Sequence, residues 1–187
     1  MRSIMWQLGL VLGFILAITF TTVSAADIAT FKSSKYRFGF NYPKEWKREQ
    51  PKLPGTIVKV TSPDGMLNFN AGAERDKTLR NVHPKVFVKY FSARQITETY
   101  DKEFSNFRLL QAGETTLCNQ PAYYVVYTHI WKSMGTQLPW KNMTVMANRS
   151  GIQYTLTAGG HPDQFDKHRD LLMSIFASFV TDAPLTE

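Results

Sequence analysis

Residues 122–131, Ala-Tyr-Tyr-Val-Val-Tyr-Thr-His-Ile-Trp, decide the fold of this protein. Their β-branched and aromatic side chains favour a strand, in which neighbouring side chains point to opposite faces of the sheet. A strand with apolar side chains on both faces belongs inside a sheet that is covered on both sides. The apolar side chains of this stretch divide into Tyr124, Val126 and Ile130 on one face and Tyr123, Val125, Tyr127 and Trp131 on the other.

Strand patterns recur on either side of this stretch. Ser62-Pro63-Asp64-Gly65 has the composition of a turn, because Pro fixes φ and Gly accepts a positive φ, and it should close a hairpin. Residues 26–30 are expected to form a short flexible lead. The predicted strands other than 122–131 span residues 36–42, 57–61, 67–73, 107–117, 143–147 and 152–158.

Two segments have the three- and four-residue spacing of amphipathic helices instead. The first runs from Pro84 to Phe104, and His83 should cap its N-terminus. The second opens at Pro162. The side chains expected on the buried sides are Val86, Tyr90, Ala93, Thr97, Tyr100 and Phe104 in the first helix and Phe165, Leu172, Ile175, Phe176 and Phe179 in the second.

The order of the predicted elements is β-β-β-α-β-β-β-β-α. Strands this close in sequence connect as antiparallel hairpins, and two helices are available to cover the two apolar faces. The sequence therefore predicts an α+β fold: an α-β-α sandwich whose antiparallel sheet has six to seven strands and helices on both faces. No repeat or linker divides residues 26–187, which we expect to form a single domain.

Residues 1–25 have the pattern of a cleavable export signal. Arg2 precedes an uncharged apolar run at 8–20, and Val23-Ser24-Ala25 supplies the small residues of a cleavage site. The alternative is an uncut membrane anchor, but the apolar run is shorter than the roughly 20 residues that span a bilayer. The residue directly after the cleavage site is Ala26 and not a cysteine. We therefore expect a secreted or periplasmic protein that has no lipid anchor and does not span the membrane.

A basic stretch at residues 32–52 is the main candidate binding surface. It holds seven basic and two acidic residues, and so accounts for most of the net charge of +7. Such a surface attracts an acidic protein or an anionic envelope component, whereas the alternative is an ordinary solvated face. Nucleic acid is not an expected partner outside the cytoplasm. The candidate partner-binding residues in this stretch are Lys35, Arg37, Lys44, Lys47 and Arg48.

Trp140 is a sixth candidate for partner binding. It belongs to residues 132–141, an expected long turn in which Met134 and Leu138 are also apolar. Apolar side chains gathered in an exposed turn often meet a partner. The alternative is that the turn folds back over the domain's own surface.

No residue pattern predicts catalysis. Cys118, the only cysteine, lies in an expected hairpin turn without a neighbouring base, and we interpret it as a passive thiol. His161, Asp163, Asp166 and His168 lie close together in sequence, but their spacing fits no standard zinc site and is more typical of a helix-capping loop. We therefore expect no catalytic residue, no metal site and no cofactor, and a protein that is not an enzyme.

Several short motifs resemble those of PsbP-like domains. Residues 38–46, Phe-Gly-Phe-Asn-Tyr-Pro-Lys-Glu-Trp, resemble the F-x-x-x-Y-P-x-x-W opening of that family. Gln120-Pro-Ala-Tyr-Tyr resembles the hairpin entry before its central strand, and Tyr154-Thr-Leu-Thr-Ala with the following helix resembles its C-terminal signature. The resemblance covers residues 31–180. It implies an α-β-α sandwich and a binding or accessory role.

The sequence as a whole predicts an exported, non-catalytic accessory or binding protein of the cell envelope. The alternative is a periplasmic protein that binds a small molecule or a divalent metal. That ligand would occupy a cavity between sheet and helix, or the region from His161 to His168.

Overall fold

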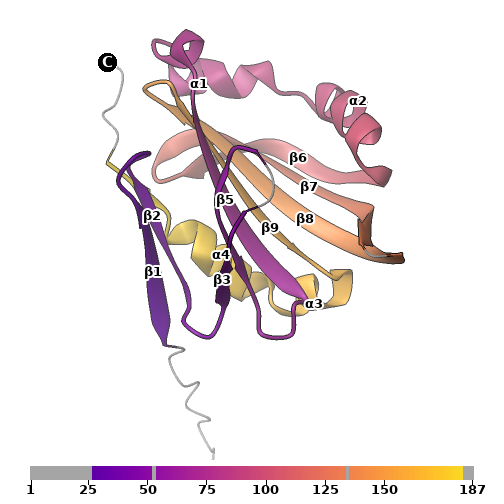
Figure 1. Cartoon of the computed structure of the whole chain (residues 1–187). Helices are drawn as coiled ribbons and strands as arrows, with labels where there is room; N and C mark the ends of the chain where they lie inside the picture. Colours follow the sequence, from indigo (N-terminus) through magenta and orange to yellow (C-terminus); the bar gives the residue numbers. More distant parts are fainter. Residues whose placement is uncertain (1–26, 52–53, 134, 183–187) are drawn as a thin grey trace, which may run out of the picture.

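Two antiparallel sheets form the framework of the computed structural model, which describes residues 27–51, 54–133 and 135–182 (Figure 1). The predicted export signal at 1–25 lies outside these residues. The larger sheet has the strand order β3-β4-β5-β9-β8-β7-β6 and the smaller one β1-β2-β10. The bounds are β1 Ile28–Ser33, β2 Phe38–Pro43, β3 Lys47–Glu49, β4 Thr56–Thr61, β5 Leu67–Arg75, β6 Ser105–Leu117, β7 Gln120–Ser133, β8 Thr136–Arg149, β9 Ile152–Gly160 and β10 Val180–Thr181.

Helices cover both faces of the larger sheet, as the apolar pattern of 122–131 predicts (Figure 1). One cover consists of α1 (Pro84–Phe87), the 3-10 helix η2 (Val88–Tyr90) and α2 (Ala93–Glu103), and the other of α3 (Pro162–Lys167) and α4 (Arg169–Ala177). A further 3-10 helix, η1, spans Lys77–Leu79. Tyr123, Val125 and Tyr127 of β7 are at most 6% exposed beneath the first cover. The predicted α-β-α sandwich is therefore confirmed.

The smaller sheet shares the second face with α3 and α4. Its strands contribute Phe31, Phe38 and Phe40 to the core that also holds Phe69 of β5 and Phe176 of α4. The Phe69 ring centroid lies 5.0 Å from that of Phe40 and 5.1 Å from that of Phe176, so these side chains join the two sheets and the helix. Sheet and helix together therefore form the second cover.

The first strands differ from the sequence-based expectation. The predicted strand at 36–42 corresponds to β2, which lies in the smaller sheet and not in the larger one. The flexible lead expected at 26–30 is wrong from Ile28 onward, because β1 pairs with β2 from Ile28 to Ser33. Phe31 holds β1 in place, since its ring centroid lies within 5.6 Å of those of Phe38 and Phe40.

The single helix predicted for 84–104 is interrupted. His83 caps α1 as expected, with its Nδ1 accepting a hydrogen bond from the Lys85 amide at 3.1 Å. The chain then leaves helical geometry before α2, whose N-cap is Ser92. This break changes which side chains are buried, so that Val86 and Tyr90 are about half exposed. The buried side chains are instead Phe87, Val88 and Ile96.

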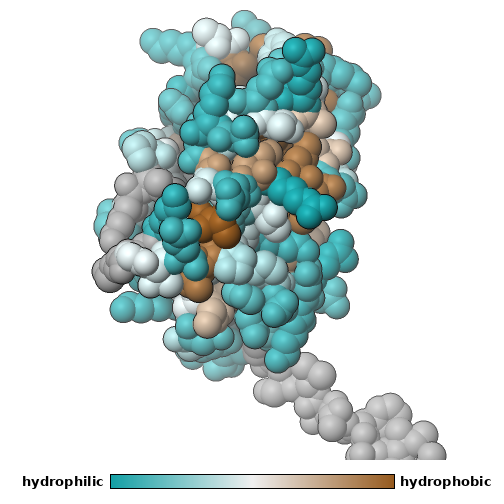
Figure 2. Space-filling view, turned by 90° about the vertical axis from the view of Figure 1, so that its right-hand side faces the viewer, coloured by the Kyte–Doolittle hydropathy of each residue, from teal (hydrophilic) through white to brown (hydrophobic). Residues whose placement is uncertain are grey.

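The outer surface is mostly hydrophilic. Figure 2 shows this for the right-hand side of Figure 1, where apolar side chains emerge in only a few places between polar ones. The large exposed apolar side chains belong to different elements: Ile28, Met66, Val86, Tyr90, Leu110, Trp131 and Val180. None of the helices in the described part of the chain is long and apolar enough to cross a membrane.

Both covers should be needed for stability. Replacing Phe87 of the first cover or Leu172 of the second by Ala should lower the free energy of unfolding by about 2–5 kcal/mol, because each change leaves a cavity in a filled core. Val86→Ala, next to Phe87 but 49% exposed, should change it by less than about 0.5 kcal/mol. Urea unfolding of the three variants tests this expectation, and a loss confined to one cover would contradict it.

His129 of β7 should make stability depend on pH. Its ring is packed 4.7 Å from that of Phe104, and burial lowers the pKa of His129 from its usual value. Below about pH 6.5 His129 therefore binds a proton more readily in the unfolded chain than in the folded chain. As the pH is lowered, stability falls by at most about 1.4 kcal/mol per pH unit. His129→Gln should flatten the fall measured by urea unfolding between pH 7.5 and 5.5. An unchanged slope would show that His129 is protonated equally in both states.

Candidate functional site

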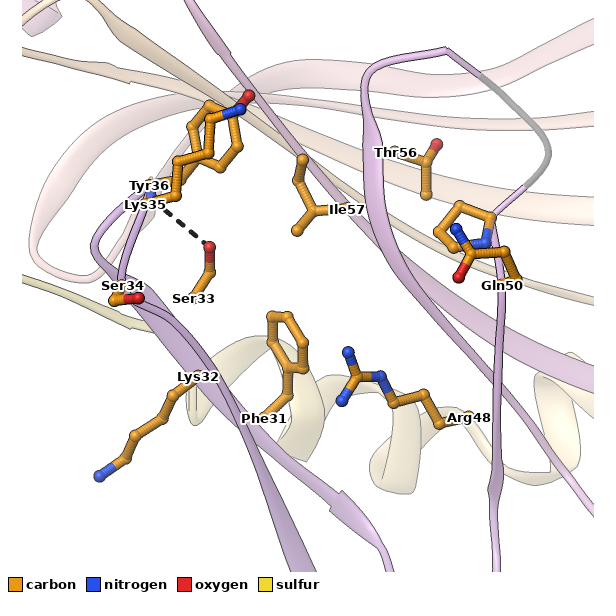
Figure 3. A pocket seen from close by; sticks show the side chains of 11 residues that line it. Phe31, Lys32, Ser33, Ser34, Lys35, Tyr36, Arg48, Gln50, Thr56 and Ile57 are labelled. Atoms are coloured by element: carbon orange, nitrogen blue, oxygen red, sulfur yellow. Dashed lines mark hydrogen bonds between the residues drawn. The ribbon is translucent and has the colours of Figure 1, made fainter.

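A pocket of about 440 Å³ lies where the smaller sheet meets the edge of the larger one (Figure 3). β1 and the β1–β2 turn line one side, and β3 and the start of β4 line the other. Among its described lining residues are three cationic side chains and no Asp or Glu. We call it the basic pocket, and define it by Phe31, Lys32, Lys35, Tyr36, Arg48 and Ile57.

Arg48 is held over an aromatic ring at the base of the pocket. Its guanidinium carbon lies 4.9 Å from the centroid of Phe31, and Figure 3 shows the group pointing toward that ring. A cation–π contact at an exposed site contributes about 0.5–1 kcal/mol and uses none of the N–H donors. Within the described chain Arg48 has no ion pair or hydrogen bond from its side chain. The contact therefore positions the guanidinium and leaves its donors open to a ligand.

Glu49 does not neutralise Arg48, although the two are neighbours in sequence. Successive side chains of a strand point to opposite faces, so Lys47 and Glu49 lie on the face of β3 away from Arg48. Glu49 pairs with Lys59 at 2.9 Å, and the hydrogen bond from Lys59 lowers the pKa of the Glu49 carboxyl. The Glu49 carboxylate therefore neutralises Lys59 and not Arg48.

The β1–β2 turn holds Lys35 by its backbone. The Lys35 carbonyl accepts a hydrogen bond from Arg75 Nη2 at 3.0 Å, and the Tyr36 carbonyl accepts one from the buried Tyr154 hydroxyl at 2.9 Å. The Lys35 Nζ lies 5.0 Å from the ring centroid of Tyr36 and makes no ion pair with any described residue. Lys35 therefore presents a free charge from a fixed backbone.

The structure separates the five basic residues predicted to bind a partner, and Lys47 lies on the face of β3 away from the pocket. Lys35 and Arg48 line the basic pocket. Arg37 and Lys44 are already paired with acidic residues outside the basic stretch, Arg37 Nε with Asp182 at 3.1 Å and Lys44 Nζ with Asp27 at 3.6 Å.

Lys32 is a lining residue that the sequence-based candidates omit. It belongs to the basic stretch and lies at the rim, with its side chain extending outward in Figure 3. The sequence indicates Lys32 only through its position in the basic stretch, directly after Phe31.

Trp140 does not join this site. It lies on β8, which β4, β5 and β9 separate from β3, and it is only 8% exposed. The expected long turn is short, because β7 continues to Ser133 and pairs there with Thr136 of β8. The Trp140 ring packs 5.5 Å from that of Trp131, so this indole lies against the domain's own surface, which is the alternative left open by the sequence.

The cluster from His161 to His168 is a pair of helix ends. The His161 carbonyl accepts the Phe165 amide at 2.8 Å to begin α3, and His168 lies between α3 and α4. Asp166 is used by Lys141, whose Nζ lies 2.5 Å from its Oδ1. In residues 27–51, 54–133 and 135–182, no group of three or more His, Cys, Asp and Glu side chains is placed to hold a metal ion.

Cys118 occupies the predicted hairpin turn. Cys118 and Asn119 have φ angles of 48° and 58°, as in the two-residue turns whose twist matches antiparallel strands. The thiol is half-buried and free. It lies between β6 and β7, at the opposite edge of the larger sheet from β3.

The fold is similar to that of several solved proteins. The solution structure of cyanobacterial PsbP (CyanoP) from Synechocystis sp. PCC 6803 has a TM-score of 0.61 at 15% identity, over 86% of this chain and 95% of that chain. LpqN, involved in cell envelope biogenesis of Mycobacterium tuberculosis, has a TM-score of 0.53 at 13% identity, over 87% and 88%. The Saccharomyces cerevisiae Ran-binding protein Mog1p has 0.51 at 6% identity, over 84% and 96%. At such identities the similarity shows the fold alone.

Sequence comparison identifies the family. No curated protein matches the chain at a significant level. The model of the PsbP-like protein family matches residues 19–181, which include every motif that resembles this family as well as both sheets and both helical covers. The chain therefore belongs to the PsbP-like protein family.

Proposed function

We propose that this protein is an exported, non-catalytic binding protein of the cell envelope whose basic pocket holds an acidic segment of a partner protein. The observation that carries the proposal is the pair of uncompensated cations, Lys35 and Arg48, on opposite sides of one pocket (Figure 3). The signal-like pattern of residues 1–25 supports export.

The chemistry of the pocket favours a carboxylate. A guanidinium offers paired N–H donors that match the two oxygens of a carboxylate, and the Lys35 ammonium adds a mobile point charge. The described lining contains no histidine or carboxylate to act as a base for the nearby Ser33 and Ser34 hydroxyls. These side chains are therefore suited to binding an anion rather than to acyl transfer.

The strands beside the pocket favour a protein segment over a small anion. β1 ends the smaller sheet and β3 ends the larger one, so within the described residues each has an edge without a neighbouring strand. An extended segment can add to such an edge through main-chain hydrogen bonds while its side chains enter adjacent pockets. An acidic side chain would then meet Arg48 and Lys35.

Proteins of similar fold make a binding role reasonable. Mog1p is a Ran-binding protein, and LpqN is involved in cell envelope biogenesis. Fold similarity alone does not assign function. The binding role of this chain is therefore inferred from its own basic pocket.

A metal-binding role is the weaker candidate. His161 Nδ1 and Asp163 Oδ2 are 3.9 Å apart, and Asp166 is engaged with Lys141. A divalent ion would have to displace the Lys141 ammonium in order to use Asp166. The small-molecule candidate has a better location, a second cleft beneath α4.

Charge removal at the pocket should weaken binding of an acidic peptide. A fluorescent decaglutamate peptide is the probe, measured by anisotropy in about 50 mM salt. The double variant Lys35→Gln, Arg48→Gln should bind about tenfold or more weakly, because each lost ion pair contributes up to about 1 kcal/mol. The matched control Arg37→Gln, Lys44→Gln removes the same charge from residues that already have partners, and should lose much less.

The outcomes separate this proposal from its rivals. Equal losses in the two double variants would show attraction to net charge alone and contradict a pocket. Binding to vesicles of anionic phospholipid but not to the peptide would replace the acidic protein with a membrane surface. If the peptide result holds, cross-linking in the native cells should capture a partner with wild type and with the control variant, and not with the pocket variant.

A further inference from the structure

A second cleft, of about 280 Å³, lies between α4 and the part of the larger sheet formed by β6, β7 and β8. We call it the α4 cleft and define it by Tyr124, Val126, Met143, Arg169, Leu172 and Met173. It lies on the face opposite α1 and α2, near the β6 edge of the sheet, whereas the basic pocket lies at the β3 edge. The two sites are thus separate.

The walls of the cleft are apolar and incompletely buried. Tyr124, Val126 and Met143 form the floor, and each is half-buried, as is Met173 on the helix above them. When a ligand covers apolar side chains that face a cavity and are in contact with water, the free energy falls. Methionine side chains suit such a surface, because they are flexible and polarisable and adapt to different shapes.

Gly113 on β6 helps to leave this space open. A Cβ at Gly113 would lie 3.3 Å from Cε1 of Tyr124. The tyrosine ring therefore packs against the edge strand β6 at Gly113, and a larger residue at this position would crowd the ring. The ring then forms one side of the cleft. A side chain at Gly113 would press it toward the space beneath α4.

The rim of the cleft carries one cation that is not paired with any residue the structure describes. Lys141 and Asp166 form an ion pair at 2.5 Å and neutralise each other, with the Lys141 Nζ 5.3 Å from the ring centroid of Phe165. Arg169 also lines the cleft, and it makes no ion pair or side-chain hydrogen bond with any described residue. As the first residue of α4 it adds to the positive end of the helix dipole, which favours an anion there.

We infer that the α4 cleft binds a single-chain amphiphilic carboxylate. The carboxylate meets the Arg169 guanidinium, and the hydrocarbon chain lies along Val126, Met143 and Met173. The volume is at the lower end of small-molecule sites, which favours a chain of medium length. This site does not depend on the acidic partner proposed for the basic pocket.

The test uses purified protein and a series of straight-chain carboxylates from butanoate to dodecanoate. Each methylene that enters the cleft should tighten binding about three- to fourfold, until the chain outgrows the space and the gain stops. Octanamide, which has the same chain without the charge, should bind several-fold more weakly than octanoate. Methyl NMR should show octanoate shifting the signals of Met143 and Met173 in a saturable way.

Matched variants locate the head group and the chain. Arg169→Gln should weaken octanoate binding about fivefold or more, whereas Lys167→Gln, the same charge change on an exposed α3 residue outside the cleft, should leave it unchanged. Val126→Thr keeps the shape of the floor but adds a hydroxyl, and should also weaken binding. The double variant Lys35→Gln, Arg48→Gln should bind octanoate normally.

Some results would overturn the inference. One is octanoate binding that survives Arg169→Gln and Val126→Thr unchanged. Another is an absence of saturable shifts at Met143 and Met173. Failure of the decaglutamate experiment alone would leave this site standing, since neither Arg169 nor Val126 takes part in it.

Discussion

The two-sided burial of β7 is the constraint on which the rest of the structure depends. Both faces of β7 are nearly inaccessible to water, at Tyr123, Val125 and Tyr127 on one face and at Ala122 on the other. The sheet therefore requires other elements to cover both of its faces. The chain supplies these elements at two points in its sequence. α1 and α2 follow β5 and cover one face, whereas α3 and α4 follow β9 and cover the other (Figure 1).

The second cover is composite, and both candidate sites lie at its margins. The smaller sheet packs toward the β3 end of the larger sheet, and α4 lies closer to its middle. Where β1 faces β3 the cover leaves the basic pocket, and where α4 stops short of β6 and β7 it leaves the α4 cleft. At each margin an apolar side chain packed against the core is only partly buried, Ile57 at one and Met143 at the other, beside a cation that no described residue neutralises.

The elements with strong local periodicity could be predicted from sequence, and those that depend on distant partners could not. β7, β9 and the turn at Cys118 follow from alternation and turn-forming residues close together in the chain. β10 has two residues and exists only because Val180 and Thr181 pair with Gly39 and Phe38. The break before Ser92 was missed because Val86 and Tyr90 continue a helical spacing that tertiary packing does not use. Likewise, the basic stretch contains no sign that Arg37 would meet Asp182.

A count of charges along a segment treats every lysine and arginine alike, but a fold neutralises some of them and leaves others free. Here Lys35, Arg48 and Arg169 make no ion pair with a described residue and lie beside cavities. CyanoP shares the fold at 15% identity, so the sandwich is maintained although most positions differ. Side chains at the margins of the second cover are among those least restricted by packing. The chemistry of each member should therefore be read from these margins rather than from the sandwich that supports them.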